Sequence, residues 1–391
     1  MDVERRAISV LHVMGVLTGD RGGATTATLA IAEATSLAGD RATILTTVAP
    51  GDDLDAVRSL TGVDLVTAPR HAPRHVSTSL PLVGWLWRHV REHDLVEVHE
   101  VFAFPTVATR VVCRLRGVPM VVHPHGSLEP YDMRKHARVK ALLRPALRRL
   151  LTGSAAVWLT AQREADNLAH LGGGITTVVT PLPVRPDGLR GDRAAFRARY
   201  GLDGSDRVVL FLGRLDPKKG IDRLVEAFER VRDDDERVRL VVAGGGDPGF
   251  VATVEHRLAS GRHAASVRTT GFVAGQDRAD AFAGADLFCL HSDRENFGIA
   301  PVEAAGAGLP ALLSDEVYVG DDLAAAGAAV VVAATDVAAL AGAMARLLAD
   351  DAELARLATA ARAAGAGFAP ERVAELDAGV RRELLGSRRR G

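Results

Sequence analysis

The stretch Ser292-Asp-Arg-Glu-Asn-Phe-Gly-Ile-Ala-Pro-Val-Glu-Ala-Ala305 carries two glutamates, Glu295 and Glu303, on either side of a loop that runs into a helix. Gly298 lets a ligand approach the backbone closely. Pro301 needs no amide hydrogen in the first turn of a helix, so it indicates that a helix begins here. The amides before Pro301 are then free at the positive end of the helix dipole, which favours a bound anion. Carboxylates that accept from hydroxyls, beside amides that donate to a phosphate, suit a sugar nucleotide.

This Glu-x7-Glu spacing, followed by Ala304-Ala-Gly-Ala-Gly-Leu-Pro310, resembles the signature of the retaining GT-B glycosyltransferases of family 4, the group 1 glycosyl transferases. The resemblance implies a nucleotide diphosphate sugar as the donor substrate. It implies that Glu303 binds the ribose hydroxyls and that Glu295 binds hydroxyls of the donor sugar. The loop residues that it places against the donor are Asn296, Phe297, Gly298 and Ile299. Taken alone, two surface acids that flank an ordinary loop-to-helix junction would be the simpler interpretation.

Length and composition indicate a globular protein with two domains. The chain has 391 residues, of which 47% are hydrophobic and 25% are charged. The net charge of −1 gives no overall field that would attract nucleic acid, so no nucleic-acid partner is expected. Cys113 and Cys289 lie in apolar runs and are expected to be buried thiols, which fits a reducing compartment. No apolar run is long enough to span a membrane. We expect a cytoplasmic protein, with a peripheral place at the inner face of the membrane as the open alternative.

Short apolar runs alternate with longer helical patterns, which predicts parallel sheets built from strand–helix units. The strands expected before the Pro- and Gly-rich segment 181–191 are 8–14, 41–47, 63–67, 95–99, 119–123, 156–160 and 176–180. Those expected after it are 207–212, 238–243, 267–270, 287–290, 311–313 and 328–332. The sequence therefore predicts an α/β protein with doubly wound, Rossmann-like domains at 1–183, on the acceptor side, and at 184–368, on the donor side. The resemblance implies that these face each other across a cleft, as in the GT-B fold, and that a final helix at 369–391 packs back on the first domain.

A second motif lies between Phe211 and Gly220, where a strand ends in Gly-Arg-Leu and Lys-Lys-Gly opens an amphipathic helix. Arg214 can bind phosphate oxygens through two N–H groups, and a lysine can add a point charge near the helix start. Lys218 and Lys219 are equivalent by charge and position, so either could supply this cation. The motif resembles the Gly-Arg-Leu…Lys-Gly motif of the same family, whose spacing favours Lys219. The resemblance implies that Arg214 and Lys219 hold the diphosphate, whereas a solvated basic turn is the alternative.

A glycine-rich segment follows the strand expected at 238–243. It contains a formal Gly-x-Gly-x-x-Gly, but Asp247-Pro248 is interpreted as a turn, and the next strand ends without an acid, so a nicotinamide site is not expected. The resemblance implies instead that this turn and Gly271-Phe272-Val273 line the nucleoside pocket. The base is expected to meet the backbone around Phe272 and Val273.

In the first half, Gly22 and Gly23 stand between a strand and a helix, where a backbone can approach a ligand. The resemblance places this loop against the leaving phosphate and the acceptor, whereas a plain tight turn is the alternative. His125, directly before a glycine, is the candidate for the histidine that the family places near the C6 hydroxyl of the donor sugar. His99, at the carboxyl end of a strand, is the second candidate. A lone histidine is more often structural.

The segment 134–151 is rich in lysine and arginine and has no acid. Its apolar residues recur at helical spacing, with a break expected near Pro145. It is either an ordinary surface helix or a contact for an anionic membrane surface or a phosphate-bearing acceptor.

Together these features predict a retaining, metal-independent glycosyltransferase that moves a hexosyl group from a UDP-sugar or GDP-mannose type of donor to an acceptor hydroxyl. The acceptor is expected to be a sugar, a lipid-linked sugar or a natural product, and the new bond an α-glycosidic one. Glu295, Arg214, Lys219 and His125 are the expected catalytic residues, and neither a metal nor another cofactor is expected. A sugar-nucleotide epimerase or phosphorylase of the same fold, and a non-catalytic module that binds sugar nucleotides, remain the alternatives.

Overall fold

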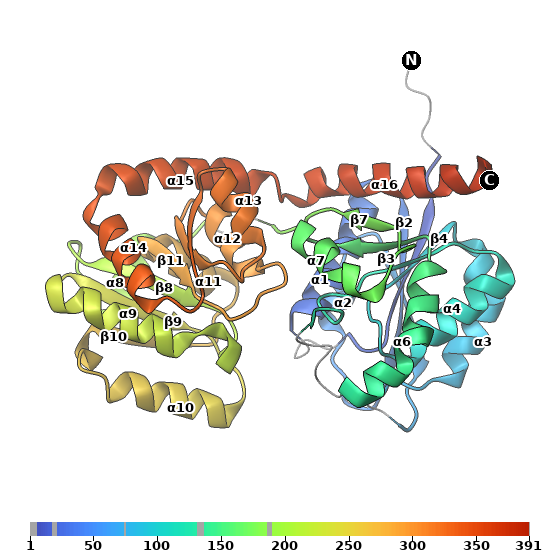
Figure 1. The fold of residues 1–391 in the computed structure, drawn as a ribbon, viewed down its shortest axis with the longest axis horizontal. Helices are drawn as coiled ribbons and strands as arrows, with labels where there is room; N and C mark the ends of the chain where they lie inside the picture. Colours follow the sequence, from blue (N-terminus) through green and yellow to red (C-terminus); the bar gives the residue numbers. More distant parts are fainter. Residues whose placement is uncertain (1–5, 18–21, 74–75, 131–136, 186–189, 391) are drawn as a thin grey trace, which may run out of the picture. The chain divides into compact units, whose positions relative to one another are not determined.

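The computed structural model describes residues 6–17, 22–73, 76–130, 137–185 and 190–390 (Figure 1). Contacts between residues divide the chain into two compact units. The N-terminal unit comprises Met1–Pro183 together with Pro370–Gly391, and the C-terminal unit comprises Val184–Ala369. Each unit is built around one parallel sheet, and each is described by itself below.

The sheet of the N-terminal unit has seven strands in the order β3-β2-β1-β4-β5-β6-β7. The strands are β1 (Ser9–Met14), β2 (Arg41–Val48), β3 (Val63–Pro69), β4 (Leu95–Val98), β5 (Met120–Val122), β6 (Ala156–Leu159) and β7 (Thr177–Val179). Every neighbouring pair is parallel. The order of the strands reverses between β1 and β4, and this switch point is where ligands bind in open α/β sheets.

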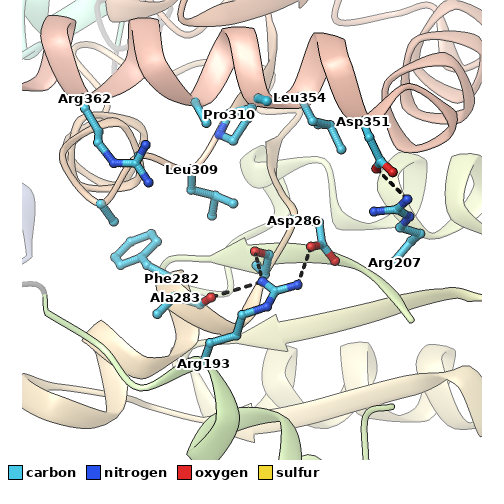
Figure 2. A pocket seen from close by; sticks show the side chains of 15 residues that line it. Arg193, Arg207, Phe282, Ala283, Asp286, Leu309, Pro310, Asp351, Leu354 and Arg362 are labelled. Carbon is cyan, nitrogen blue, oxygen red and sulfur yellow. Dashed lines mark hydrogen bonds and ion pairs between the residues drawn. The ribbon is translucent and has the colours of Figure 1, made fainter. Parts of the chain in front are cut away.

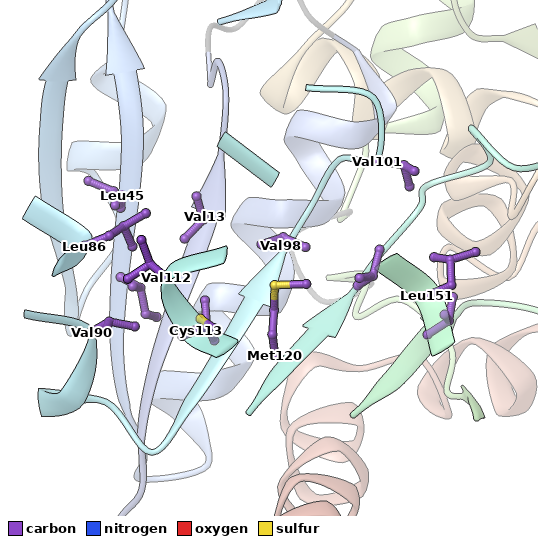
Figure 3. Close-up of a cluster of buried hydrophobic side chains, with 14 of the residues drawn as sticks. Val13, Leu45, Leu86, Val90, Val98, Val101, Val112, Cys113, Met120 and Leu151 are labelled. Carbon is purple, nitrogen blue, oxygen red and sulfur yellow. The ribbon is translucent and has the colours of Figure 1, made fainter. Parts of the chain in front are cut away.

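Helices cover both faces of this sheet. They are α1 (Gly23–Leu37), α2 (Asp55–Arg58), α3 (Leu80–His89), α4 (Phe104–Arg116), α6 (Ala137–Thr152), α7 (Gln162–Asn167) and α16 (Pro370–Arg390), with short 3-10 turns at Val90–Glu92 and Leu168–Leu171. Figure 3 shows the core on one face, where side chains of the sheet such as Val98 and Met120 pack with Val112 and Cys113 of α4. On the other face α16 packs against α1, and Val380 packs against a second cluster that contains Trp158.

The C-terminal unit has a six-stranded sheet in the order β10-β9-β8-β11-β12-β13, again wholly parallel. Its strands are β8 (Arg207–Leu212), β9 (Val238–Ala243), β10 (Val267–Gly271), β11 (Leu287–Leu290), β12 (Ala311–Ser314) and β13 (Ala329–Val332). Its helices are α8 (Arg193–Tyr200), α9 (Ile221–Asp234), α10 (Pro248–Ala259), α11 (Gly275–Gly284), α12 (Ile299–Gly306), α13 (Val319–Ala325), α14 (Val337–Ala349) and α15 (Asp351–Ala366), with 3-10 turns at Pro217–Lys219 and Ala264–Ser266. The order reverses between β8 and β11, so the second switch point lies there.

The structure confirms the predicted strands, whose ends shift by no more than two residues. Both cysteines are buried free thiols as predicted, and burial raises the pKa of Cys113 and of Cys289 to about 12. Among the described helices, none has the length and the apolar content that crossing a lipid bilayer requires.

Two predictions of local structure were wrong. Asp247-Pro248 is not a plain turn, because the Asp247 carboxylate accepts hydrogen bonds from the amides of Gly249 and Phe250 and caps α10. Helix α6 does not break at Pro145 but continues to Thr152. Burial of Leu147 and Leu151 in the core beyond the proline stabilises the continued helix.

Candidate functional site

The two most specific sequence motifs meet at the switch point of the C-terminal unit. Arg214 follows β8, and Glu295 follows β11, the strand beside it. The ammonium group of Lys219 forms an ion pair with the carboxylate of Glu295, and both side chains are mostly buried. The structure therefore brings together two residues that are 76 positions apart in the chain.

The loop around Lys219 is held against the loop after β11 by the backbone. The amide of Asp293 donates to the carbonyl oxygen of Lys218 at 2.7 Å. Gly220 lies at φ +66°, and a Cβ there would overlap the carbonyl oxygen of His291. Only glycine fits this position without displacing the backbone that carries Glu295.

Lys218 and Lys219, which are equivalent in the sequence pattern, have different contacts in the structure. Lys219 pairs with Glu295, whereas the side chain of Lys218 is exposed. Arg214 lies beside them with its side chain 58% exposed, and its guanidinium is 3.3 Å from a carboxylate oxygen of Asp216. A cation that is tethered by one surface contact remains accessible to a phosphate.

Helix α12 begins at Ile299, so Pro301 lies in its first turn as predicted, and Gly298 precedes it at φ +98°. In the described part of the chain no backbone carbonyl accepts a hydrogen bond from the amides of Gly298, Ile299 or Ala300. These free amides have the arrangement in which helix N-termini bind anions. Phe297 is buried and does not face solvent; its ring packs edge-on against Phe368, 5.9 Å away between centroids.

Glu303, on α12, forms an ion pair with Arg278 of α11. Arg278 was not among the predicted site residues, although it lies six residues after Phe272, in the helix that follows the predicted base-binding loop, and that position was a usable signal. Burial lowers the pKa of Arg278 below its usual value. An arginine beside Glu303 fixes the orientation of that carboxylate.

The loop predicted to meet the base presents a large apolar ring to solvent. The side chain of Phe272 is 81% exposed, directly after Gly271, and Val273 next to it is partly buried. The carbonyl of Gly271 accepts a hydrogen bond from the amide of Gly244 at 2.8 Å, which joins this loop to the glycine-rich turn. An exposed aromatic side chain at the carboxyl edge of a parallel sheet is suited to stack on a base.

A pocket of about 380 Å³ also lies in the C-terminal unit, but at the opposite edge of its sheet (Figure 2). Arg207 opens β8 there, and Asp286 and Pro310 stand just before β11 and β12. Figure 2 shows the charged side chains paired: Arg193 with Asp286 and Arg207 with Asp351, each at 2.6 Å. Because ligands of α/β sheets bind at the carboxyl ends of the strands, this pocket at the amino ends is not the candidate site.

At the switch point of the N-terminal unit, Gly22 and Gly23 open α1. Gly22 lies at φ +73°, and among the described residues no atom beyond the adjoining chain lies within 4 Å of the Cβ position of either glycine. Asp20 and Arg21, from the same loop, lie outside the described residues. The open space beside the two glycines is compatible with a ligand that approaches their backbone.

A line of histidines leads inward from this edge of the sheet. His125 lies at φ +44°, a region that residues other than glycine rarely occupy. Its Nε2 is 3.2 Å from Nδ1 of His99, and Nε2 of His99 is 3.1 Å from Nδ1 of His12. His99 and His12 are buried, whereas His125 is only partly so. The sequence-predicted His125 and His99 are thus in direct contact.

A buried ion pair lies beside these rings. Arg381 of α16 donates from Nε to Oε1 of Glu97 at 2.8 Å, and Nε2 of His123 is 3.1 Å from Oε2 of the same carboxylate. Sequence reasoning missed Arg381 and Glu97, because 284 residues separate them and neither belongs to a recognisable motif.

Within the described residues, His12, Glu97 and His99 form the one group of metal-binding side chains whose donor atoms all lie within 4.8 Å of one another. Their donor atoms are already used, since the two histidines face each other and Arg381 occupies the carboxylate. A divalent cation there would also lie close to a guanidinium. His12, Glu97 and His99 therefore belong to a hydrogen-bonded network.

Two protein-family models match the chain. The one described as glycosyl transferases group 1 matches residues 192–364, and the one described as a glycosyl transferase 4-like domain matches residues 22–183. Together they cover most of both units.

Curated relatives match over shorter stretches. D-inositol 3-phosphate glycosyltransferase of Xylanimonas cellulosilytica is 33% identical over 240 residues, 56% of this chain and 54% of the relative. Mannosylfructose-phosphate synthase of Agrobacterium fabrum is 34% identical over 128 residues, 31% of this chain and 28% of the relative. Phosphatidyl-myo-inositol mannosyltransferase of Mycobacterium tuberculosis is 38% identical over 135 residues, 33% of this chain and 34% of the relative. The matches thus span about a quarter to a half of the length of these relatives.

Solved structures resemble the whole chain. Anabaena Alr3699/HepE in complex with UDP and glucose has a TM-score of 0.77 at 19% identity, covering 95% of this chain and 99% of that one. Sucrose-phosphate synthase from Thermosynechococcus elongatus has a TM-score of 0.78 at 19% identity, covering 97% of this chain and all of that one. These likenesses confirm the predicted GT-B fold with its two Rossmann-like domains.

Proposed function

The chain belongs to the group 1 glycosyl transferases, and on that premise we propose that it transfers a hexosyl group from a nucleotide diphosphate sugar to an acceptor hydroxyl with retention of configuration. The observation that carries the proposal is the ion pair between Lys219 and Glu295 at a switch point, with Arg214 beside it. This arrangement offers cations for a diphosphate and a carboxylate for sugar hydroxyls within one pair of adjacent loops.

In the proposed site, Arg214 and Lys219 bind the diphosphate and stabilise the negative charge that grows on it as the sugar leaves. Preorganised charges of this kind make a large contribution to catalysis. The free amides before Pro301 add uncharged donors to the same anion. The ion pair with Lys219 orients Glu295, so that the carboxylate can accept hydrogen bonds from the hydroxyls of the donor sugar. Glu303, oriented by Arg278, accepts from the ribose hydroxyls, and the base stacks near Phe272 and Val273.

We propose front-face substitution as the chemical step. The bond from the sugar's anomeric carbon to the phosphate oxygen breaks, and the acceptor oxygen bonds to that carbon on the same face. The acceptor's proton moves to an oxygen of the departing phosphate, so atoms and charges balance and an α-glycosidic bond results. His125 contacts the donor sugar in this proposal, and Gly22 and Gly23 approach the phosphate and the acceptor.

For the donor, we propose a UDP-sugar or GDP-mannose. The UDP and glucose in the HepE structure, and the mannosyltransferase among the relatives, support that choice. We also propose that Arg214 and Lys219 replace a metal ion in neutralising the diphosphate. Donor binding should then be the same in excess EDTA and in millimolar Mg²⁺, and its loss in EDTA would contradict metal independence.

A thermal-shift panel with UDP, GDP, ADP and dTDP and their common sugars tests the proposal. At 100 times its dissociation constant, a ligand stabilises the protein by about 2.7 kcal/mol. We expect one nucleotide to stabilise the wild type and Arg214→Ala to lose that shift. Arg230→Ala is the matched control, because Arg230 is exposed on α9 and its ion pair within the described residues is with Glu226. If no nucleotide shifts the wild type, the diphosphate site is wrong.

Product analysis separates the proposed activity from its alternatives. A transferase should consume the donor only when an alcohol acceptor is present. Turnover without an acceptor would indicate an epimerase, turnover with inorganic phosphate would indicate a phosphorylase, and binding without turnover of any acceptor tried would favour a binding module.

We propose further that the protein is cytoplasmic and binds peripherally to an anionic membrane surface through α4 and α6. A mainly apolar groove of about 960 Å³ lies between these helices, lined by Val107, Val111 and Leu143 and by the cationic Arg114 and Arg149. Apolar side chains flanked by cations are typical of contacts with anionic lipids.

Only part of the basic segment is available for that contact. Arg148 donates to the carbonyl of Gly173 at 3.2 Å and so holds its own unit together. Co-sedimentation with phosphatidylglycerol vesicles should exceed that with phosphatidylcholine vesicles, and Arg114→Glu combined with Arg149→Glu should abolish the difference. Equal sedimentation with both lipids would contradict the membrane contact.

A further inference from the structure

The rings of His12, His99 and His125 form a line in which every contact joins Nδ1 of one ring to Nε2 of the next. A neutral imidazole carries one N–H and one bare nitrogen, and a hydrogen bond needs one of each. The three rings must therefore carry their proton on the same nitrogen, either all on Nδ1 or all on Nε2. A change of tautomer at one ring is transmitted to the other two.

All three rings are neutral. Burial lowers the pKa of His12 and of His125 to about 3, and it lowers the pKa of His99 well below its usual value. Near neutral pH the line therefore has only the two tautomeric states, and the groups at its ends decide between them.

Glu97 lies beside the inner end of the line. Its Oε2 is 3.5 Å from Nδ1 of His12. Burial alone would raise the pKa of Glu97, but the charge of Arg381 and the contact with His123 hold that pKa well below its usual value. A bare Nδ1 would place its lone pair against an ionised carboxylate, whereas an Nδ1–H is attracted to it. Glu97 thus favours the proton on Nδ1.

Thr35 is compatible with either state. Its hydroxyl donates to the carbonyl of Ile31 at 2.9 Å, and its oxygen, 3.2 Å from Nε2 of His12, can then accept from an Nε2–H. If the hydroxyl rotates, it can instead donate to a bare Nε2, so the choice between the two states falls to Glu97.

The outer end of the line is open. Within the described part of the chain, the hydrogen bond given for the His125 ring is the one between its Nε2 and His99, which leaves Nδ1 for a ligand. His125 is only partly buried, whereas His99 and His12 are buried. The left-handed backbone at φ +44° holds the ring in this place against its own conformational preference.

We propose that Glu97, His12 and His99 are positioning residues that hold His125 as the Nδ1–H tautomer, so that His125 presents a neutral N–H donor to an oxygen atom of the sugar nucleotide. The identity of that ligand rests on the proposed function, but the tautomer does not. Neutral histidine in water prefers the Nε2–H form, so the expected state is the opposite of the default.

Two-bond ¹H–¹⁵N correlation spectra of the full chain, labelled with ¹⁵N-histidine, read the tautomer of each ring directly. Single histidine variants assign the signals. We expect Nδ1–H at His12, His99 and His125 near neutral pH without any ligand. An Nε2–H form of His125 overturns the proposal, and the wild-type spectrum decides this whether or not a variant folds.

His99→Phe removes the link between the outer and the inner ring. His125 should then shift toward the Nε2–H form, a change that a merely structural role of His99 would not produce. His93→Phe is the matched control, because His93 is a buried histidine of the same unit that contacts Ser9 and lies outside the line. An unchanged His125 tautomer in a folded His99→Phe variant would also refute the proposal.

Ligand binding distinguishes the proposed function from the proposed tautomer of His125. His99→Phe should weaken binding of the nucleotide sugar about tenfold, the equivalent of one hydrogen bond, and should leave binding of the free nucleotide unchanged. If no nucleotide binds but the spectrum shows Nδ1–H, the proposed function fails and the tautomer stands. If the donor binds but His125 is Nε2–H, the present inference alone fails.

Discussion

Lys219 and Lys218 are adjacent in the chain, yet only Lys219 forms an ion pair with Glu295 at the switch point. We predict that Lys219→Ala weakens nucleotide binding by about 2 kcal/mol, because a charge-assisted hydrogen bond to the diphosphate is lost. Lys218→Ala should change the affinity less than twofold, since Glu295 holds Lys219 and not Lys218 at the switch point. Isothermal titration with the nucleotide from the panel measures both. Equal losses in the two variants would remove the assignment of Lys219.

Glu164 shows how burial at a single residue couples stability to pH. Its carboxylate accepts hydrogen bonds from the amide and the hydroxyl of Thr160, but burial raises its pKa to about 7 from an ordinary value of 4.5. The folded protein therefore holds a proton that the unfolded chain releases between these values. The contribution of Glu164 to the free energy of unfolding is fully present below pH 4.5. It decreases by about 3 kcal/mol as the pH rises from there through 7.

We predict that the Glu164→Gln variant does not lose this part of its free energy of unfolding as the pH rises. Urea unfolding at pH 4.5 and at pH 7.5 should show the wild type losing about 3 kcal/mol relative to Glu164→Gln. Tryptophan fluorescence is a suitable signal, because Trp85, Trp87 and Trp158 all belong to the N-terminal unit with Glu164. Parallel pH profiles of the two proteins would contradict the assignment.

At the scale of elements, the fully buried charge of Arg381 helps to join α16 to the N-terminal sheet. Arg381 bonds to Glu97 and stacks over Trp158, with its guanidinium carbon 5.4 Å from the ring centroid. We predict that Arg381→Met destabilises the unit by about 3 to 5 kcal/mol, because it leaves the buried Glu97 carboxylate without its guanidinium partner. Urea unfolding followed by the fluorescence of Trp158 measures the loss.

Two further variants control that prediction. Arg372→Met, on the same helix, should be neutral, because its ion pair with Glu375 is exposed. Glu97→Gln combined with Arg381→Met should recover part of the lost stability, because the carboxylate at position 97 that lost its guanidinium partner is then removed as well. If Arg381→Met is as stable as Arg372→Met, the buried pair does not anchor the helix.

At the scale of the whole molecule, the proposed nucleotide contacts and the tryptophans lie in different units. Arg214, Lys219 and Glu303 belong to the C-terminal unit, and every tryptophan belongs to the N-terminal unit. We predict that a free nucleotide raises the melting transition seen by circular dichroism more than the transition seen by tryptophan fluorescence. Arg214→Ala should abolish the difference. A shift that only the fluorescence detects would place the nucleotide on the other unit.

The local sequence pattern was sufficient to predict much of the fold of this protein. Apolar runs alternating with helical periodicity predicted the strands of both sheets, because a strand buried on both faces must be apolar along its length. Gly298 and Pro301 marked the start of a helix, and α12 begins at Ile299. The motifs around Arg214 and Glu295 also sit at strand ends, and parallel strands bring such ends to one edge of a sheet.

The tertiary structure alone decided which side chains are partners. Lys219 was separated from Lys218 by its contact with Glu295, Arg278 was found only through Glu303, and Arg381 only through Glu97. Nothing in the local sequence marks Arg381 as buried, since arginines on amphipathic helices usually face water. The line of histidines draws on three separate strands and loops, so its geometry exists only after the sheet has formed. The reason is physical: spacing along the chain fixes periodicity and local backbone, whereas the pairing of buried charges depends on distances that only packing sets.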